Sequence, residues 1–135
     1  AGGIIPSVLI IALPLGLITD GILHSNNTRD MATDARAGIK TMAMSLGVKS
    51  SAILYGFEVL FPFVWGGLCS IFGFMPLATV IIFMTLPVAI ACAQTMKKSV
   101  EGGMHMIADL DVRTANLQLM FSLLLTVAFV VAKFI

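Results

Sequence analysis

The most polar stretch of the sequence reads NNTRDMATDARAGIKT and carries four side chains that can bind a metal ion: Asn26, Asn27, Asp30 and Asp34. If the stretch is helical, at about 100° per residue, these four share one face. Carboxylates four residues apart lie about 6 Å from each other and repel unless a cation lies between or beside them. Carboxylate and amide oxygens suit Mg²⁺, which commonly bridges protein carboxylates to substrate phosphates. The pattern predicts a magnesium and diphosphate site.

Three basic side chains flank this face: Arg29, Arg36 and Lys40. A guanidinium group binds phosphate oxygens as a two-pronged fork, and an ammonium group binds them as a point charge. We therefore expect all three to contact the outer oxygens of a diphosphate. The alternative interpretation is a charged loop that caps two helices, since the spacing Asp-x-x-x-Asp is weak evidence when taken alone.

The rest of the chain is strongly apolar. Hydrophobic residues make up 59% of it and charged residues 11%, against about 25% charged residues in ordinary soluble domains. Four apolar runs are long enough to cross a bilayer as helices: 4–23, 51–72, 76–95 and 117–135. Backbone groups in lipid must bond internally, and long non-alternating runs exclude a barrel. The sequence predicts an all-α, integral membrane helical bundle with four transmembrane helices in a single domain over residues 1–135.

Basic residues set the expected orientation. They follow the first apolar run and separate the third from the fourth, whereas the connection around residues 73–75 has none. By the positive-inside rule both polar loops face the cytoplasm, with Lys133 as an exception at the far terminus. The net charge of +1 and the lack of a basic patch exclude nucleic acid as a partner.

Two motifs carry a family resemblance. They read Asn26-Asn27-x-Arg29-Asp30-x-x-x-Asp34-x-x-Ala37-Gly38-x-x-Thr41-x-Ala43-x-x-Leu46-Gly47 and Leu110-Asp111-x-x-Thr114-Ala115-x-Leu117-x-Leu119-x-Phe121. The first resembles the second aspartate-rich motif of the UbiA superfamily of intramembrane prenyltransferases, and the second resembles the entry to that family's last span. Within the superfamily the Asn-Asn-x-Arg-Asp form is most similar to 1,4-dihydroxy-2-naphthoate polyprenyltransferases of the menaquinone pathway.

The resemblance implies the C-terminal four spans of a fold that typically has nine. The family's first aspartate-rich motif has no counterpart here, so we expect half of the metal site and no activity from this polypeptide in isolation. It also implies a multi-pass protein of the cell (inner) membrane whose active-site loops are cytoplasmic.

The implied reaction is Mg²⁺-dependent transfer of a polyprenyl group from polyprenyl diphosphate to an aromatic acceptor. In the enzymes that the motif resembles most, the acceptor is dihydroxynaphthoate, and the ring loses its carboxylate. The resemblance implies that Asp30 and Asp34 bind the Mg²⁺ and that Arg29 takes part in catalysis. It also implies that Asn26 and Asn27 position the metal or its waters. Arg36 lies outside the matched positions. Lys40 is displaced by one residue, because the family often has its basic residue where this chain has Ile39.

Four further polar side chains are candidates for the acceptor site or its mouth: Tyr55, Glu58, Asp111 and Thr114. A carboxylate inside an apolar run, such as Glu58, is expensive enough to be functional or specifically paired. Asp111 and Thr114 could close the cytoplasmic mouth. The alternatives are a hydrogen bond from Glu58 to a neighbouring helix, and helix capping or a solvated interface near Asp111. We expect the two histidines, His24 and His105, at the membrane interface.

Two other functions fit part of the pattern. A prenyltransferase specific for 4-hydroxybenzoate belongs to the same superfamily, although its motif usually lacks the Asn-Asn-x-Arg lead-in. A fragment of a transporter would use Asp20, Asp30, Asp34 and Glu58 as an ion path. Transporters place such carboxylates near the bilayer midplane, whereas only Glu58 lies deep inside an apolar run.

Overall fold

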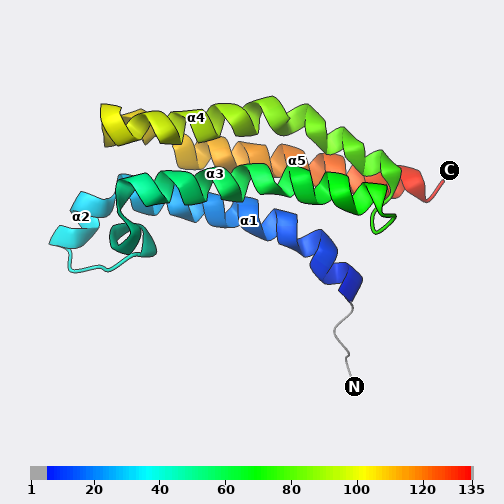
Figure 1. Ribbon diagram of the computed structural model, residues 1–135, viewed down its shortest axis with the longest axis horizontal. Coiled ribbons are helices and arrows are strands. Elements are labelled where there is room, and N and C mark those ends of the chain that lie inside the picture. Colours follow the sequence, from blue (N-terminus) through cyan, green and yellow to red (C-terminus); the bar gives the residue numbers. More distant parts are fainter. Residues whose placement is uncertain (1–5, 135) are drawn as a thin grey trace, which may run out of the picture.

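The computed structural model of the chain describes residues 6–134, and every regular element in that part is helical. The predicted all-α class is therefore confirmed. The α-helices are α1 (Pro6–Arg29), α2 (Met31–Arg36), α3 (Met42–Ile71), α4 (Leu86–Gly102) and α5 (Leu110–Ala132). A 3₁₀ helix precedes each of the last two, η1 (Leu77–Thr85) before α4 and η2 (Met104–Ile107) before α5 (Figure 1).

Four helical segments are long and apolar enough to cross a membrane: Val8–Arg29, Met42–Ile71, Leu77–Gly102 and Met104–Ala132. Each predicted apolar run falls mainly in one of them, while residues 4, 5 and 135 lie outside the described part. The helices extend beyond the runs at their polar ends. Hydropathy locates only the lipid-embedded portion, whereas backbone hydrogen bonding continues the helix into polar sequence.

The four long helices form a bundle in which α1 packs against α3 and α5, and α3 packs against α4 (Figure 1). Its core contains aromatic side chains from two helices. The ring of Phe63 on α3 meets that of Phe121 on α5 edge to face, with centroids 5.4 Å apart and planes at 89°, a favourable arrangement for aromatic pairs. Large apolar side chains such as Ile53 and Ile71 are exposed on the outside, as expected of helices that face lipid.

The polar stretch contains the end of α1, the short helix α2 and the loop that leads into α3. Helix α1 ends at Arg29 and α2 begins at Met31, yet the backbone N–H of Asp30 bonds to the carbonyl of Asn26 at 3.0 Å and that of Asp34 bonds to Asp30 at 2.9 Å. The four-residue helical spacing therefore persists across the break. Asn26, Asp30 and Asp34 keep the register that the sequence predicts.

Two glycines of the matched motif explain how the chain turns back into α3. Gly38 has φ of 72°, and Gly47 interrupts α3 with φ of 74° and ψ of 163°. Side-chain-bearing residues rarely adopt these conformations. Between the glycines, the Thr41 hydroxyl accepts the backbone N–H of Met44 at 3.3 Å and caps the start of α3. The motif's glycines and threonine thus shape the loop that presents its polar residues.

Candidate functional site

Arg29, the last residue of α1, organises the polar stretch. Its Nε donates to Oδ1 of Asp30 at 2.9 Å, and its Nη2 donates to Oδ2 of the same carboxylate at 3.1 Å. This two-pronged contact fixes the plane of the carboxylate. Nη2 also donates to the side-chain oxygen of Asn26. Three residues of the first motif are therefore held as one unit.

The same guanidinium group connects the first motif to the second. Nη1 of Arg29 lies 2.9 Å from Oδ2 of Asp111 in α5 and donates to the carbonyl of Ala108 at 3.0 Å. The sequence suggests Asp111 as a residue of the cytoplasmic mouth and does not indicate which side chain it contacts. In the structure it joins the start of α5 to the aspartate-rich stretch, at the same end of the bundle.

Within the described residues the ion-pair unit has no side-chain hydrogen bond or ion pair to the other four candidates of the polar stretch: Asn27, Asp34, Arg36 and Lys40. Asp34 and Asn27 are half-buried, and among residues 6–134 no hydrogen bond or ion pair engages the Asp34 carboxylate. Arg36 and Lys40 are exposed. The structure thus gathers Arg29 and its partners, and leaves these four side chains accessible for contacts outside the described bundle.

The oxygen donors of the stretch fit Mg²⁺ in chemistry. Two carboxylates and two amides carry them, in Asp30, Asp34, Asn26 and Asn27, and Mg²⁺ normally completes its six positions with water and phosphate oxygens. Within the described residues no group of three or more His, Cys, Asp or Glu side chains comes together.

A buried pair inside the bundle corrects one expectation. His24 of α1 is 3% exposed and lies with its Nδ1 2.9 Å from Oε1 of Glu58 on α3, so its predicted place at the interface is wrong. Helix α1 continues past the apolar run, and His24 faces α3 rather than the membrane surface. Glu58 makes the bond to a neighbouring helix that the sequence left as an alternative. His24 Nε2 and Glu58 Oε2 are buried and have no partner within the described part.

Tyr55 and Thr114 form a second buried contact between helices. The Tyr55 hydroxyl lies 2.6 Å from Oγ1 of Thr114, which donates to the carbonyl of Leu110 at 2.7 Å. Since the threonine proton is used in that bond, Tyr55 is the donor of the pair. Both side chains are enclosed in the bundle core. Their predicted role beside an aromatic acceptor stays a prediction.

An apolar groove of about 750 Å³ runs along the exposed side of α1. It is lined by α1 residues from Leu9 to Asp20 and by Trp65 of α3, whose indole N–H donates to the carbonyl of Ile10 at 2.9 Å. Asp20 marks its polar end. Because seven residues are about two helical turns, Asp20 shares a face of α1 with Asn27. The groove therefore leads toward the polar stretch.

The comparisons with known proteins agree with the motifs. The family model described as "UbiA prenyltransferase family" matches residues 1–108. The chain is 37% identical over 121 residues to the UbiA prenyltransferase domain-containing protein 1 homolog of Drosophila melanogaster, covering 87% of this chain and 31% of that protein. It is 35% identical over 119 residues to the UbiA prenyltransferase domain-containing protein 1 of Homo sapiens, covering 85% and 32%. The chain thus spans about a third of the length of the curated relatives it matches. No solved structure matches it.

Proposed function

The chain belongs to the UbiA prenyltransferase family, and we propose that the protein containing it transfers a polyprenyl group from polyprenyl diphosphate to an aromatic ring. The observation that carries the proposal is the clustering of Asn26, Arg29, Asp30 and Asp111 at one end of an apolar bundle. A diphosphate is charged and requires polar partners such as these, whereas an isoprenoid chain is apolar and packs favourably along the apolar helices.

The aspartate-rich stretch is the proposed diphosphate site. When bound, Mg²⁺ neutralises negative charge that develops on the departing diphosphate. Asp30 and Asp34 are the proposed ligands, and the amides of Asn26 and Asn27 orient the metal or its waters. Arg29 holds the Asp30 carboxylate in place, while the exposed Arg36 and Lys40 are available to bind outer phosphate oxygens.

The groove along α1 is the proposed path of the isoprenoid tail. Its walls are apolar from Leu9 to Leu17, and its Asp20 end points along the helix toward Asn27. A tail bound there would place its diphosphate at the polar stretch. Apolar walls also keep water from the allylic cation that forms when the diphosphate leaves.

For the acceptor we propose 1,4-dihydroxy-2-naphthoate, with loss of its carboxylate, in menaquinone biosynthesis. The support is the lead-in Asn26-Asn27-x-Arg29 before Asp30; the names of the relatives state the family and no acceptor. The other candidate within the family is 4-hydroxybenzoate. The same proposal places the chain as the C-terminal part of a nine-helix domain in the cell (inner) membrane, with both polar loops cytoplasmic.

The test uses the full-length protein reconstituted in lipid with Mg²⁺, a polyprenyl diphosphate and either acceptor. Asp30→Asn and Asp34→Asn should each lower kcat/KM about a hundredfold or more, since each removes charge that stabilises the transition state. Asp109→Asn, an exposed acidic residue outside the motif, is the matched control and should retain activity. Normal turnover by both motif variants would overturn the proposed site, and prenylation of 4-hydroxybenzoate alone would overturn the acceptor.

A further inference from the structure

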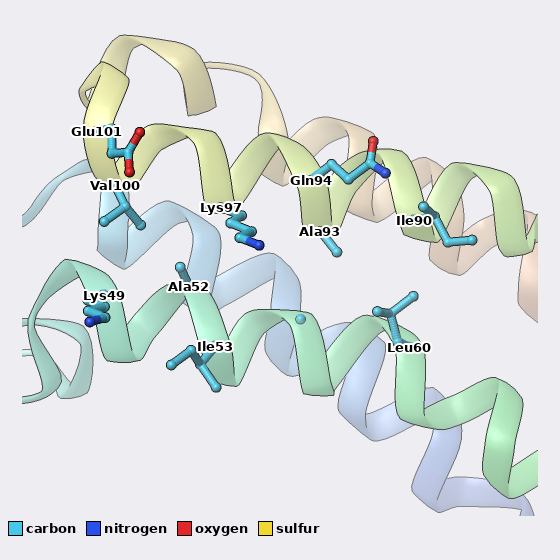
Figure 2. A pocket seen from close by; sticks show the side chains of 11 residues that line it. Lys49, Ala52, Ile53, Leu60, Ile90, Ala93, Gln94, Lys97, Val100 and Glu101 are labelled. Atoms are coloured by element: carbon cyan, nitrogen blue, oxygen red, sulfur yellow. The ribbon is translucent and has the colours of Figure 1, made fainter.

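A second groove lies between α3 and α4, away from the aspartate-rich stretch. It has a volume of about 550 Å³, and none of residues 26–40 lines it. Its apolar walls include Ala52, Gly56 and Leu60 from α3 and Ile90 and Ala93 from α4 (Figure 2). We call it the α3–α4 groove. It is independent of the proposed transfer reaction.

Small residues create this groove. Ala52 and Gly56 are four residues apart and so share one face of α3, opposite Ala93 of α4. A Cβ atom built at Gly56 would meet nothing within 4 Å. The flanking side chains Ile53 and Ile90 are 69% and 41% exposed. The two helices therefore leave an apolar channel that is open along the outside of the described bundle.

One end of the α3–α4 groove is positively charged. Lys49 on α3 and Lys97 on α4 line it together with Glu101 (Figure 2), which leaves one net positive charge. Both lysines are exposed, and neither forms an ion pair within residues 6–134. Lysine stems pack along apolar surface and carry their ammonium groups to the headgroup level. An anionic group on an apolar chain complements this arrangement.

The length of the groove matches one leaflet of a bilayer. From Lys49 to Leu60 it follows α3 for about 16 Å, at about 1.5 Å per residue. Half of a bilayer core of about 30 Å is about 15 Å. A lipid whose headgroup lies at the lysines would therefore lay an acyl chain along the groove as far as the bilayer midplane.

We propose that the α3–α4 groove binds an anionic phospholipid, with its phosphate between Lys49 and Lys97 and one acyl chain against Ala52, Gly56 and Ala93. The net positive charge disfavours zwitterionic lipids, whose ammonium group would lie close to the lysines. Polyprenyl diphosphate is also an anionic amphiphile. Its proposed site is the aspartate-rich stretch, so it enters the test as a competitor.

The test is native mass spectrometry of the full-length protein with palmitoyl-oleoyl phosphatidylglycerol or the phosphatidylcholine of identical chains. The wild type should retain one phosphatidylglycerol in preference to phosphatidylcholine. Lys49→Gln and Lys97→Gln should each weaken phosphatidylglycerol binding roughly fivefold, as expected for the loss of one lysine at an anionic headgroup. Lys98→Gln is the matched control, because Lys98 is an exposed lysine on the same helix that does not line the groove.

A second variant tests the acyl-chain part of the site. Gly56→Leu places its side chain in open space, so it should fill the groove and reduce lipid binding without changing either lysine. Equal retention of the two lipids, or equal losses in Lys98→Gln and Lys97→Gln, would overturn the proposal. Displacement of the retained lipid by farnesyl diphosphate in the Asp34→Asn variant would also overturn it, because the groove would then take the prenyl donor.

Discussion

Nη1 of Arg29 lies 2.9 Å from Oδ2 of Asp111, and this ion pair joins the end of α1 to the start of α5. Arg29 uses its other donors to grip Asp30 and Asn26. The position of the Asp30 carboxylate therefore depends on a residue of the distant second motif. Asp111 acts through Arg29, so it is a positioning residue in the proposed mechanism.

Asp111→Asn should lower kcat/KM of the full-length protein while leaving the proposed Mg²⁺ ligands unchanged. The variant weakens a charge-assisted bond that orients Arg29, and a partly exposed pair of this kind contributes about 1 kcal/mol. A double-mutant cycle with Arg29→Gln, read by thermal unfolding in detergent, should show coupling of about that size. Strict additivity of the two changes would contradict the positioning role, and Asp109→Asn serves as the control for loss of charge near α5.

Thr114→Val should destabilise the bundle more than Tyr55→Phe does. In Tyr55→Phe, the Thr114 hydroxyl still donates to the carbonyl of Leu110, so only one neutral bond is lost, about 1 kcal/mol. In Thr114→Val, the buried Tyr55 hydroxyl keeps its donor and loses its acceptor, which costs about 1–3 kcal/mol. Thermal unfolding of the two variants compares these costs. The reverse order would mean that Tyr55 is not the donor.

Replacing one member of the His24–Glu58 pair should cost more stability than replacing both. Glu58→Leu leaves a buried imidazole, and His24→Leu leaves a buried carboxylate, each without its 2.9 Å partner. The unpaired group then carries its full desolvation cost, whereas the double variant leaves neither group unpaired. Unfolding midpoints of the two single variants and the double variant test this order. Glu101→Leu, at an exposed position, controls for the loss of a carboxylate.

Local patterns predicted the helices and the polar face, but they could not predict which helices touch. Hydropathy located all four spans, because burial in lipid depends on each segment's own composition. The four-residue register of Asp30 and Asp34 also follows from local sequence, and it persists across the break between α1 and α2. The pairing of Arg29 with Asp111 depends on α1 packing beside α5, which no local period specifies.

The surroundings of individual polar side chains could not be predicted from the sequence either. His24 is isolated in the sequence, without metal-ligand spacing, and is therefore expected at the interface. In the structure α1 continues to Arg29, and His24 faces Glu58 of α3. The sequence indicated only that Glu58 needs a partner or a function, because a lone carboxylate inside an apolar run is costly. It did not identify His24 as that partner. The expected phosphate contacts of Arg36 and Lys40 stay predictions, and both side chains are exposed.

Gly47→Ala should destabilise the protein although glycine is the poorer helix former. Gly47 has φ of 74° and ψ of 163°, a region that is almost confined to glycine, so alanine there costs about 1–3 kcal/mol. Gly56→Ala is the matched control on the same helix, because its added Cβ meets nothing within 4 Å and alanine favours a helix by roughly 0.5–1 kcal/mol. The two unfolding midpoints should therefore move in opposite directions. If Gly47→Ala were as stable as Gly56→Ala, the chain could turn from the aspartate-rich loop into α3 without a glycine-only conformation, and the motif's second glycine would need another explanation.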